Sequence, residues 1–366
     1  MASVLTLMRP MKEGDGHYSY SRNSLLQREG VEIAKVLIKD AIAERLDLEQ
    51  VISSSSPSRA FTIADLGSSC GPNATIAVQN IIESVKHKHQ SYSLNQGSLE
   101  FQVFFNDLPS NDFNTLFKSL PLDSQYWASG VPGSFLGRLF PKASLHFVHA
   151  SYALHFVSII PKELVDENSP AYNKGRISYN KSQKEAVEAY SAQYRRDMEA
   201  FLSSRAEELV AGGLIALLIP CLPDGVPPAK CSSFATIDLL EASLFDMAEL
   251  GLVSEAKIDS FNMTKYHPTQ WELEALVKEN GCFNIERIEA IVRPGDGLEK
   301  ISDINMVILH LRAIWEGLIR QHFGDDIVDE LFHRWSQKIA ESSLRLRQVE
   351  YKHVTELFFL LKRNMA

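Results

Sequence analysis

The stretch AFTIADLGSSCGPN, residues 60–73, decides the fold that this sequence predicts. Its first half, Phe61–Leu66, is an apolar, β-branched run with the length and composition of a buried strand. Gly67 and Gly71 follow it, and beyond them apolar residues recur at helical spacing from residue 76 to residue 85. A strand, a glycine-rich turn and a helix in this order are typical of a nucleotide-type pocket at the carboxyl end of the first strand of an α/β fold.

The spacing of the two glycines indicates which kinds of ligand the turn does not bind. G-x-x-x-G differs from the G-x-G-x-x-G of dinucleotide-binding oxidoreductases, and no G-K-[ST] follows it as in a P-loop. An NAD-dependent oxidoreductase is therefore disfavoured, and the turn is either plain strand-to-helix geometry or a cofactor loop of another kind. Asp65, near the end of the strand, places a carboxylate beside whatever the turn binds.

An acidic residue ends the second predicted strand as well. Residues 99–105, LEFQVFF, form an apolar run that Asn106 and Asp107 follow. In a nucleotide-type fold, a carboxylate at this tip accepts hydrogen bonds from ribose hydroxyls. A second interpretation stays open, because Asp107 also precedes a helix predicted near Asn111, and aspartate is a good helix cap.

The rest of the chain repeats the alternation of strands and helices. Further strands are predicted over 144–149, 214–219, 283–292 and 353–362, and helices over 23–42, 182–209, 237–250, 268–279, 304–323 and 326–340. Gly212 and Gly213 are expected to stop the helix over 182–209, and Thr269 to cap the helix over 268–279. Repeated βαβ units predict a mostly parallel sheet with helices on both faces. The late helices exceed what one sheet needs, so we expect a helical cap beside the pocket.

Composition and charge exclude some classes of partner. The chain has 366 residues, enough for one large domain with an elaboration or for two domains. Its net charge of −9 argues against nucleic acid or an anionic membrane as a partner, because both need a basic face. The longest apolar run, residues 214–223, is too short to span a membrane. The four cysteines form no C-x-x-C pair, and reduced cysteines in a cytoplasmic protein are the simplest interpretation.

Two later segments carry side chains suited to a pocket. Residues 131–141, VPGSFLGRLFP, are rich in glycine and aromatic residues, which predicts a loop over a ligand or between core elements. The strand over 144–149 ends in His149 and leads into a second such segment, which contains Ser151, Tyr152, His155 and Phe156. These side-chain types suit a substrate pocket at the carboxyl edge of the sheet, although for each taken singly ordinary packing is the better interpretation.

Taken together, nine blocks in order along the chain resemble the plant SABATH family of small-molecule methyltransferases, which use S-adenosylmethionine. The blocks are MKEG (11–14), YSRNSLLQ (20–27), IADLGSSCGPN (63–73), FNDLPSNDFN (105–114), PGSFLGRLFP (132–141), LHFVHASYAL (145–154), YNKGRI (172–177), DSFN (259–262) and HFG (322–324). The blocks are spread in the family's order from residue 11 to residue 324, so the resemblance covers nearly the whole chain. An ordered set of this kind is far more specific than any single motif in it.

The resemblance implies a fold and an organisation. It implies a methyltransferase-type, Rossmann-like α/β sheet with a helical cap over the active site, in one unit spanning residues 1–366 and present as a homodimer. The cofactor-binding core would comprise residues 24–150, 182–222, 280–293 and 350–366. An N-terminal lid would comprise residues 1–23, and the interleaved cap residues 151–181, 223–279 and 294–349.

The resemblance also implies roles for single residues. The positions that match the S-adenosylmethionine site are Tyr20, Ser68, Asn73, Asp107, Leu108, Ser134, Phe135 and Ser151, with Asp107 on the ribose and Phe135 beside the adenine. The positions that match the substrate pocket are Gln27, Tyr152, His155 and Phe156. A magnesium site in the family matches Asn173, Asp259, Phe261 and Asn262, although methyl transfer from a sulfonium requires no metal.

The implied chemistry needs no catalytic triad. A carboxylic acid, with a pKa of about 4, is already an ionised nucleophile at neutral pH, so catalysis is mostly alignment in a dry pocket. In relatives that act on small aromatic acids, a Gln at the position of Gln27 and a Trp at the position of Phe156 resemble hydrogen-bond donors to the carboxylate. Phe156 has no N–H, which leaves Gln27 and whatever His155 offers, either a neutral donor or a positive charge.

The leading hypothesis is therefore a carboxyl O-methyltransferase that forms the methyl ester of a small plant acid, positioned by Gln27 and His155. The departure at Phe156 leaves room for a bulkier acid or for N-methylation of a xanthine-type heterocycle. A rival of another class is a small-molecule-binding homologue that kept the fold and lost turnover.

Overall fold

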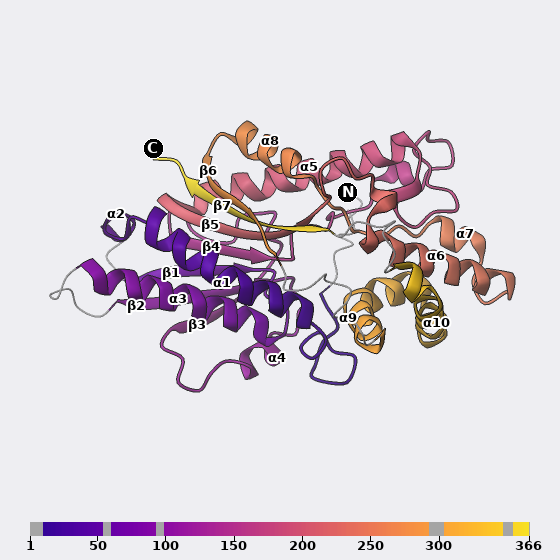
Figure 1. The fold of residues 1–366 in the computed structure, drawn as a ribbon, viewed down its shortest axis with the longest axis horizontal. Coiled ribbons are helices and arrows are strands. Elements are labelled where there is room, and N and C mark those ends of the chain that lie inside the picture. The colour runs from indigo at the N-terminus through magenta and orange to yellow at the C-terminus, as the bar shows by residue number, and fades with distance from the viewer. Residues whose placement is uncertain (1–9, 54–59, 93–98, 293–303, 347–353, 366) are drawn as a thin grey trace.

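The computed structural model describes residues 10–53, 60–92, 99–292, 304–346 and 354–365. In this part of the chain a seven-stranded sheet has the order β3-β2-β1-β4-β5-β7-β6 (Figure 1). The strands are β1 (Ala60–Leu66), β2 (Glu100–Asp107), β3 (Trp127–Pro132), β4 (Leu145–Ser151), β5 (Leu209–Cys221), β6 (Phe283–Ala290) and β7 (Thr355–Arg363). Strands β1 to β5 pair in parallel, whereas β7 is antiparallel to both β5 and β6. The predicted, mostly parallel sheet is confirmed.

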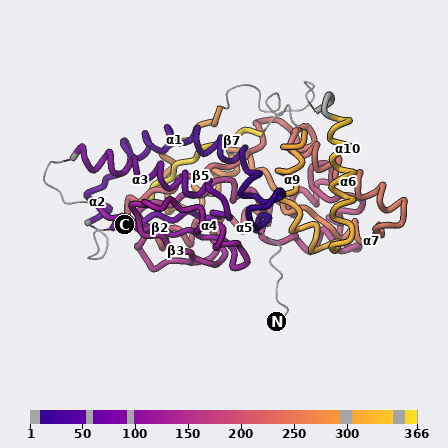
Figure 2. The backbone as a smooth tube through the Cα atoms, turned by 90° about the horizontal axis from the view of Figure 1, so that it is seen from below, coloured from indigo at the N-terminus to yellow at the C-terminus, as the bar shows by residue number. Residues whose placement is uncertain are grey.

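Helices cover both faces of the sheet, and a second group of helices lies at one end of the molecule. The helices are α1 (Leu25–Arg45), α2 (Leu48–Ser53), α3 (Pro72–Tyr92), α4 (Phe113–Lys118), α5 (Lys184–Glu208), α6 (Ser232–Glu249), α7 (Glu255–Asp259), α8 (Gln270–Asn280), α9 (Ile304–Phe323) and α10 (Val328–Leu346). Figure 1 and Figure 2 both place α6, α7, α9 and α10 together at the end away from α2. These helices form the cap that the sequence predicts. Among the described residues, no helix is both long and apolar enough to cross a membrane.

The alternation of side chains in β5 shows how the sheet holds two cores. Leu214, Ala216 and Leu218 pack with α1 and α3 in one buried cluster. Ile215 and Leu217, on the other face, pack with α5 and the cap in the second. Because successive side chains of a strand point to opposite faces, a continuous apolar run is what a strand with helices on both sides requires.

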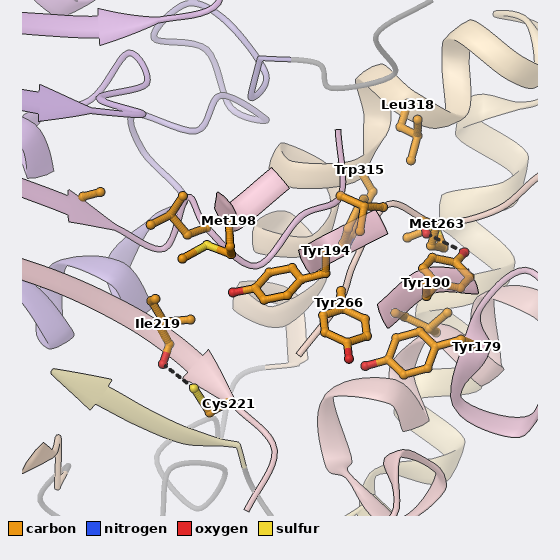
Figure 3. Packing of buried hydrophobic residues seen from close by; sticks show 14 of the residues in the cluster. Tyr179, Tyr190, Tyr194, Met198, Ile219, Cys221, Met263, Tyr266, Trp315 and Leu318 are labelled. Carbon is orange, nitrogen blue, oxygen red and sulfur yellow. Dashed lines mark hydrogen bonds between the residues drawn. The ribbon is translucent and has the colours of Figure 1, made fainter. Parts of the chain in front are cut away.

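The second core continues from the sheet into the cap through a cluster of tyrosines (Figure 3). The ring of Tyr266 lies 4.7 Å from that of Tyr194 and 5.2 Å from that of Tyr179, centroid to centroid. The Tyr190 hydroxyl donates a hydrogen bond of 2.9 Å to the carbonyl of Met263. The segment that precedes α8, which contains Met263 and Tyr266, is therefore fixed against α5.

Some sequence predictions were wrong in detail. The helix over 182–209 ends at Glu208, and Gly212 and Gly213 lie inside β5 instead of stopping the helix. Gly212 has φ +78, and a Cβ on Gly213 would lie 3.0 Å from the Val210 carbonyl, because the pairing of β4 with β5 is shifted here by a bulge. The two glycines permit the irregular backbone of β5 at this point, which the helical periodicity of the preceding residues does not predict.

Other elements were either missed or confirmed. Strand β3 and the short helices α2 and α7 were not predicted. The N-terminus of α8 was predicted correctly, since Thr269 and Glu272 form a reciprocal capping box there. The cap of α4 is Asp112, which accepts a hydrogen bond from Thr115 N, so the interpretation of Asp107 as a helix cap is wrong. Most of the predicted linker over 53–58, and the first nine residues of the predicted lid, lie outside the described residues.

Candidate active site

A cleft of about 830 Å³, counted to its open mouth, lies where the carboxyl ends of β1, β2 and β4 meet the cap. This is the edge at which parallel α/β sheets bind ligands. The residues that line it are Pro10, Met11, Tyr20, Gly67, Ser69, Asp107, Leu108, Ser134, Phe135, Ser151, Tyr152, Ala153, Phe156, Thr264, Ile314, Trp315 and Leu318. They come from the N-terminal segment, the sheet edge, the loop before β4, the segment after β4, the segment before α8 and helix α9.

The glycine-rich turn after β1 forms the floor of the cleft. Gly67 has φ +77, and a Cβ placed on it would lie 2.5 Å from the Cβ of Ala153. The backbone N–H groups of Gly67 and Ser68 both donate to the carbonyl of Asn106, at 2.9 Å each. The turn is thus tied to the end of β2, and only glycine permits its close approach to the segment after β4.

Asp107 lies beside this turn with its carboxylate held by backbone donors. Its Oδ2 accepts a hydrogen bond of 2.7 Å from Ser69 N, and its Oδ1 accepts one of 2.7 Å from Leu108 N. Burial raises the pKa of Asp107 to about 6, the nearby Asp65 adding to the rise while the two N–H donors oppose it. A carboxylate fixed in this way at the edge of a cleft can accept further hydrogen bonds from ligand hydroxyls.

A buried ion pair holds the loop between β3 and β4, which carries Ser134 and Phe135. Arg205, fully buried, donates to the carbonyls of Phe135 and Gly137 at 2.6 and 2.9 Å and to Oε2 of Glu208 at 2.7 Å. The other oxygen of Glu208 accepts N–H groups of the same loop, those of Leu139 and Phe140. Sequence reasoning missed this pair, because an Arg and a Glu three residues apart in a helix are most often surface neighbours.

The described part of the predicted lid packs across the cleft. Lys12 N donates to the carbonyl of Ala313 in α9 at 2.8 Å, and Lys12 Nζ donates to Glu316 at 2.7 Å. Tyr20 is buried against Cys70 of the glycine-rich turn and Ala313. The segment therefore connects the cap to the sheet edge over the cleft.

The acceptor end of the cleft, as we name the part lined by Tyr152, Phe156, Thr264 and Trp315, is largely aromatic. Phe156 meets Trp315 edge to face, with ring centroids 5.7 Å apart. An indole is therefore present beside position 156, but it comes from α9. The Tyr152 hydroxyl donates to Oε2 of Glu356 at 2.7 Å, which ties this end of the cleft to β7.

Gln27 and His155, predicted to position the substrate, do not line the cleft. The Gln27 amide lies 3.4 Å from Nε2 of His310 in α9, and its Oε1 is buried with no hydrogen-bond partner among the described residues. Burial, with the nearby Lys265 adding to it, lowers the pKa of His155 to about 3, so its imidazole is neutral at pH 7. Of the two forms that the sequence allowed for His155, the structure selects the neutral one.

The structure brings together six of the eight residues predicted for the cofactor. Tyr20, Asp107, Leu108, Ser134, Phe135 and Ser151 line the cleft, whereas Ser68 and Asn73 do not. Ser68 Oγ donates to the carbonyl of Asp65, and the Asn73 amide donates to Ser24, which fixes α3 to the start of α1. Asp65 does not line the cleft, because its carboxylate pairs with His149 Nδ1 at 2.6 Å in the interior of the protein.

The residues predicted to bind magnesium do not fit a metal site as they are arranged. Oδ1 of Asn262 accepts a hydrogen bond of 2.8 Å from Asn173, whose own Oδ1 accepts one from Ser182. Oδ1 of Asp259 accepts a hydrogen bond from Gly175 N, and Phe261 packs its ring on Phe323. Since these oxygens are engaged by N–H and O–H donors, we derive no step of the chemistry from a metal. The described residues contain no group of three or more His, Cys, Asp or Glu placed to hold a metal ion.

Sequence reasoning also missed the contribution of α9 to the cleft. Ile314, Trp315 and Leu318 line it, and Trp315 and Leu318 appear beside the tyrosine cluster in Figure 3. The apolar stripe of this helix was visible in the sequence, but no local signal shows that the stripe faces the ends of β1 and β4.

Known proteins resemble this chain over nearly its whole length. The model of a family described as SAM-dependent carboxyl methyltransferase matches residues 7–364. Loganic acid O-methyltransferase of Catharanthus roseus is 44% identical over 97% of this chain and 94% of its own length. Paraxanthine methyltransferase 2 of Arabidopsis thaliana is 37% identical over 96% of this chain and 97% of its own.

A solved structure gives the same result for the fold. It is that of loganic acid methyltransferase with S-adenosylhomocysteine, which is 43% identical, covers 97% of this chain and 99% of its own, and superposes with a TM-score of 0.91. The cleft of this chain, with a fixed carboxylate at the tip of β2 and a glycine turn at its floor, suits the same nucleoside. The chain belongs to the family of S-adenosylmethionine-dependent carboxyl methyltransferases, also known as the SABATH family.

Proposed function

We propose that this enzyme methylates the carboxylate of a small, non-aromatic plant acid of the loganic acid kind. The observation that carries the proposal is the chemistry of the acceptor end, where the lining residues Tyr152, Phe156, Thr264 and Trp315 include no carboxylate and no imidazole. His155 lies behind this lining, and with a pKa of about 3 it is a poor general base. An acceptor that arrives already ionised fits such a site, and a carboxylic acid is ionised at neutral pH.

One end of the cleft would bind the cofactor, and the acceptor end would bind the acid. S-adenosylmethionine supplies a methyl group on a positively charged sulfur. Asp107 would bind the ribose hydroxyls, and Phe135, held by the Arg205–Glu208 pair, would lie against the adenine. The aromatic walls at Phe156 and Trp315 would exclude water and hold the acid in line with the methyl group, which is the main source of rate when no proton must move.

The size and shape of the acid follow from the same walls and from the relatives. The 44% identical relative acts on loganic acid, and Trp315 adds to Phe156 a second large ring, set at 67° to the first. The two rings pack edge to face and together form a bulky apolar wall at this end of the cleft. This wall and the 44% identical relative support an acid of the loganic acid kind.

A panel of acceptors with S-adenosylmethionine labelled in its methyl group tests the proposal. Loganic acid, salicylate, farnesoic acid and paraxanthine are incubated separately with the enzyme, and the label in each product is treated with base. Base-labile label from loganic acid supports ester formation. Base-stable label from paraxanthine would establish N-methylation instead, the activity named for the 37% identical relative. Cofactor binding without label in any product would point to a homologue that binds small molecules and turns them over weakly.

Replacing Asp107 with Asn is expected to weaken S-adenosylmethionine binding about 10- to 100-fold, because hydrogen bonds to a charged acceptor contribute about 1.5–3 kcal/mol each. The wild-type affinity should itself fall as the pH drops through about 6, where Asp107 gains a proton, and the D107N affinity should not change over this range. Calorimetric titration between pH 5 and pH 8 measures both effects.

Asp112→Asn is the matched control for this experiment. Asp112 also accepts backbone hydrogen bonds, from Gly14 and Thr115, but it does not line the cleft. A D112N variant that lost affinity as strongly as D107N would contradict the role of Asp107 on the ribose.

We also propose, on the resemblance to the family, that two copies of the chain assemble and that the protein works in the cytoplasm. Light scattering on the purified protein measures its mass in solution, and a mass of twice 41.1 kDa would support the homodimer. Imaging of a fluorescent fusion tests the location.

A further inference from the structure

A short pair of extended segments forms the wall behind the acceptor end. The backbone of Phe156 bridges that of Lys265 in antiparallel fashion. Val157 N donates to the carbonyl of Thr264 at 2.7 Å, and Tyr266 N donates to that of His155 at 2.9 Å. Phe156 and Thr264 line the cleft directly, so this pairing places Lys265 and His155 immediately next to the acceptor end.

The ammonium group of Lys265 is partly buried in this wall without an acidic partner. Its Nζ lies 3.4 Å from the carbonyl of Ser233 and 5.6 Å from the centroid of the Phe234 ring, at the start of α6. In the part of the chain that the structure describes, no carboxylate lies within ion-pair distance of it. Charges removed from water are nearly always paired, because an unpaired charge in the interior costs several kcal/mol.

The titratable groups that face Lys265 are two imidazoles and a thiol. They are His155, His267 and Cys231, from three different segments of the chain. The rings of His155 and His267 stack with centroids 5.7 Å apart, and burial together with the charge of Lys265 lowers the pKa of both, so both are neutral at pH 7. His155 Nδ1 is buried with no hydrogen-bond partner among the described residues. The wall therefore has one positive charge and one unused polar nitrogen.

We propose that Lys265 is a specificity-determining residue, whose positive charge selects ionised carboxylic acids over neutral acceptors such as heterocycles. The inference rests on the proposed function and explains how the site tells the two classes of acceptor apart. An anion at the acceptor end supplies the opposite charge that the protein does not provide. Because solvent screens charges weakly in a closed site, the charge of Lys265 attracts an anion held against Phe156, whose backbone pairs with that of Lys265.

The pKa of Lys265 gives the proposal a signature that a structural role would not produce. Burial lowers this pKa to about 8, with Cys231 opposing the change, so the ammonium is charged at pH 7 and loses its charge as the pH rises through about 8. The KM for an acid should therefore rise above pH 8 in the wild-type enzyme. In Lys265→Met the KM should be at least about tenfold higher and should not depend on pH in this range. Lys265→Arg should keep the low KM to higher pH, because a guanidinium stays charged.

The experiment compares the wild-type enzyme with K265M and K265R. For each enzyme, the KM for loganic acid is measured between pH 6.5 and pH 9.5. The inhibition constant of the neutral primary amide of loganic acid is measured as well. Wild type should prefer the acid over the amide, and K265M should lose at least about tenfold of this preference while its affinity for S-adenosylmethionine is unchanged. Lys88→Met is the control, because Lys88 is a buried lysine that donates to the carbonyls of Ile42 and Ala43, far from the cleft. K88M should lose stability and keep the pH dependence.

The outcomes separate this inference from the function on which it rests. A K265M enzyme with an unchanged KM, an unchanged preference for acid over amide and an unchanged rise above pH 8 overturns the inference alone, provided that the wild-type product is a base-labile ester. A wild-type product that is base-stable overturns the proposed function itself.

Discussion

Replacing Glu208 with Gln is expected to lower the free energy of unfolding by about 3–5 kcal/mol, since it leaves Arg205 buried without its counter-charge. Both side chains are fully buried, so water cannot compensate for the lost charge. The same change should weaken S-adenosylmethionine binding, because Glu208 and Arg205 together hold the backbone of residues 135–140 beside the cleft. Urea denaturation measures the first effect and calorimetric titration the second.

The neighbouring residue provides the control for this prediction. Glu207 forms an ion pair with Arg138, but their side chains are 55% and 46% exposed. Exposed pairs contribute little, so Glu207→Gln should change the free energy of unfolding by about 1 kcal/mol or less. Equal destabilisation in E207Q and E208Q would contradict the role that we assign to the buried pair.

Replacing Gly67 with Ala is expected to lower both stability and cofactor affinity. An alanine at φ +77 costs about 1–2 kcal/mol from backbone strain alone. Its Cβ would also lie 2.5 Å from the Cβ of Ala153, so either the turn or the segment after β4 must move. Because both line the cleft, S-adenosylmethionine binding should weaken by at least about tenfold.

Gly175→Ala separates the strain from the steric clash. Gly175 has φ +68, close to that of Gly67, but a Cβ placed on it meets no atom within 4 Å. G175A should therefore lose only the strain energy and bind the cofactor normally. A G67A protein with the stability and affinity of G175A would show that the contact with Ala153 is unimportant. Thermal unfolding and calorimetric titration compare the two variants.

The sequence predicted those features that a local pattern of neighbouring residues determines. The run Phe61–Leu66 and the glycines after it predicted β1, its turn and α3. Asp107 was found because it is an acidic residue at the end of an apolar strand. Strand β3 was missed because it lies at the edge of the sheet with its side chains largely exposed, so WASGVP contains no apolar run.

The residues that could not be predicted owe their roles to contacts between distant segments. Trp315 reaches the cleft only because the cap folds over the ends of β1 and β4, and nothing near it in the sequence records that contact. Arg205 and Glu208 serve a loop about 70 residues earlier in the chain. In the same way, Lys265 is a notable cation only once Phe156 and His155 are known to lie beside it.

The position of β7 determines when this molecule can fold. β7 comes after every other described element, yet it lies inside the sheet between β5 and β6. During synthesis on the ribosome, the edge of β5 that pairs with β7 stays without this partner until residues 355–363 have emerged. Domains otherwise tend to fold from the N-terminus as they are made, and an open apolar edge invites pairing with other chains. A chain cut before residue 355 would therefore lose an interior strand of the sheet and leave β5 and β6 without the partner that joins them.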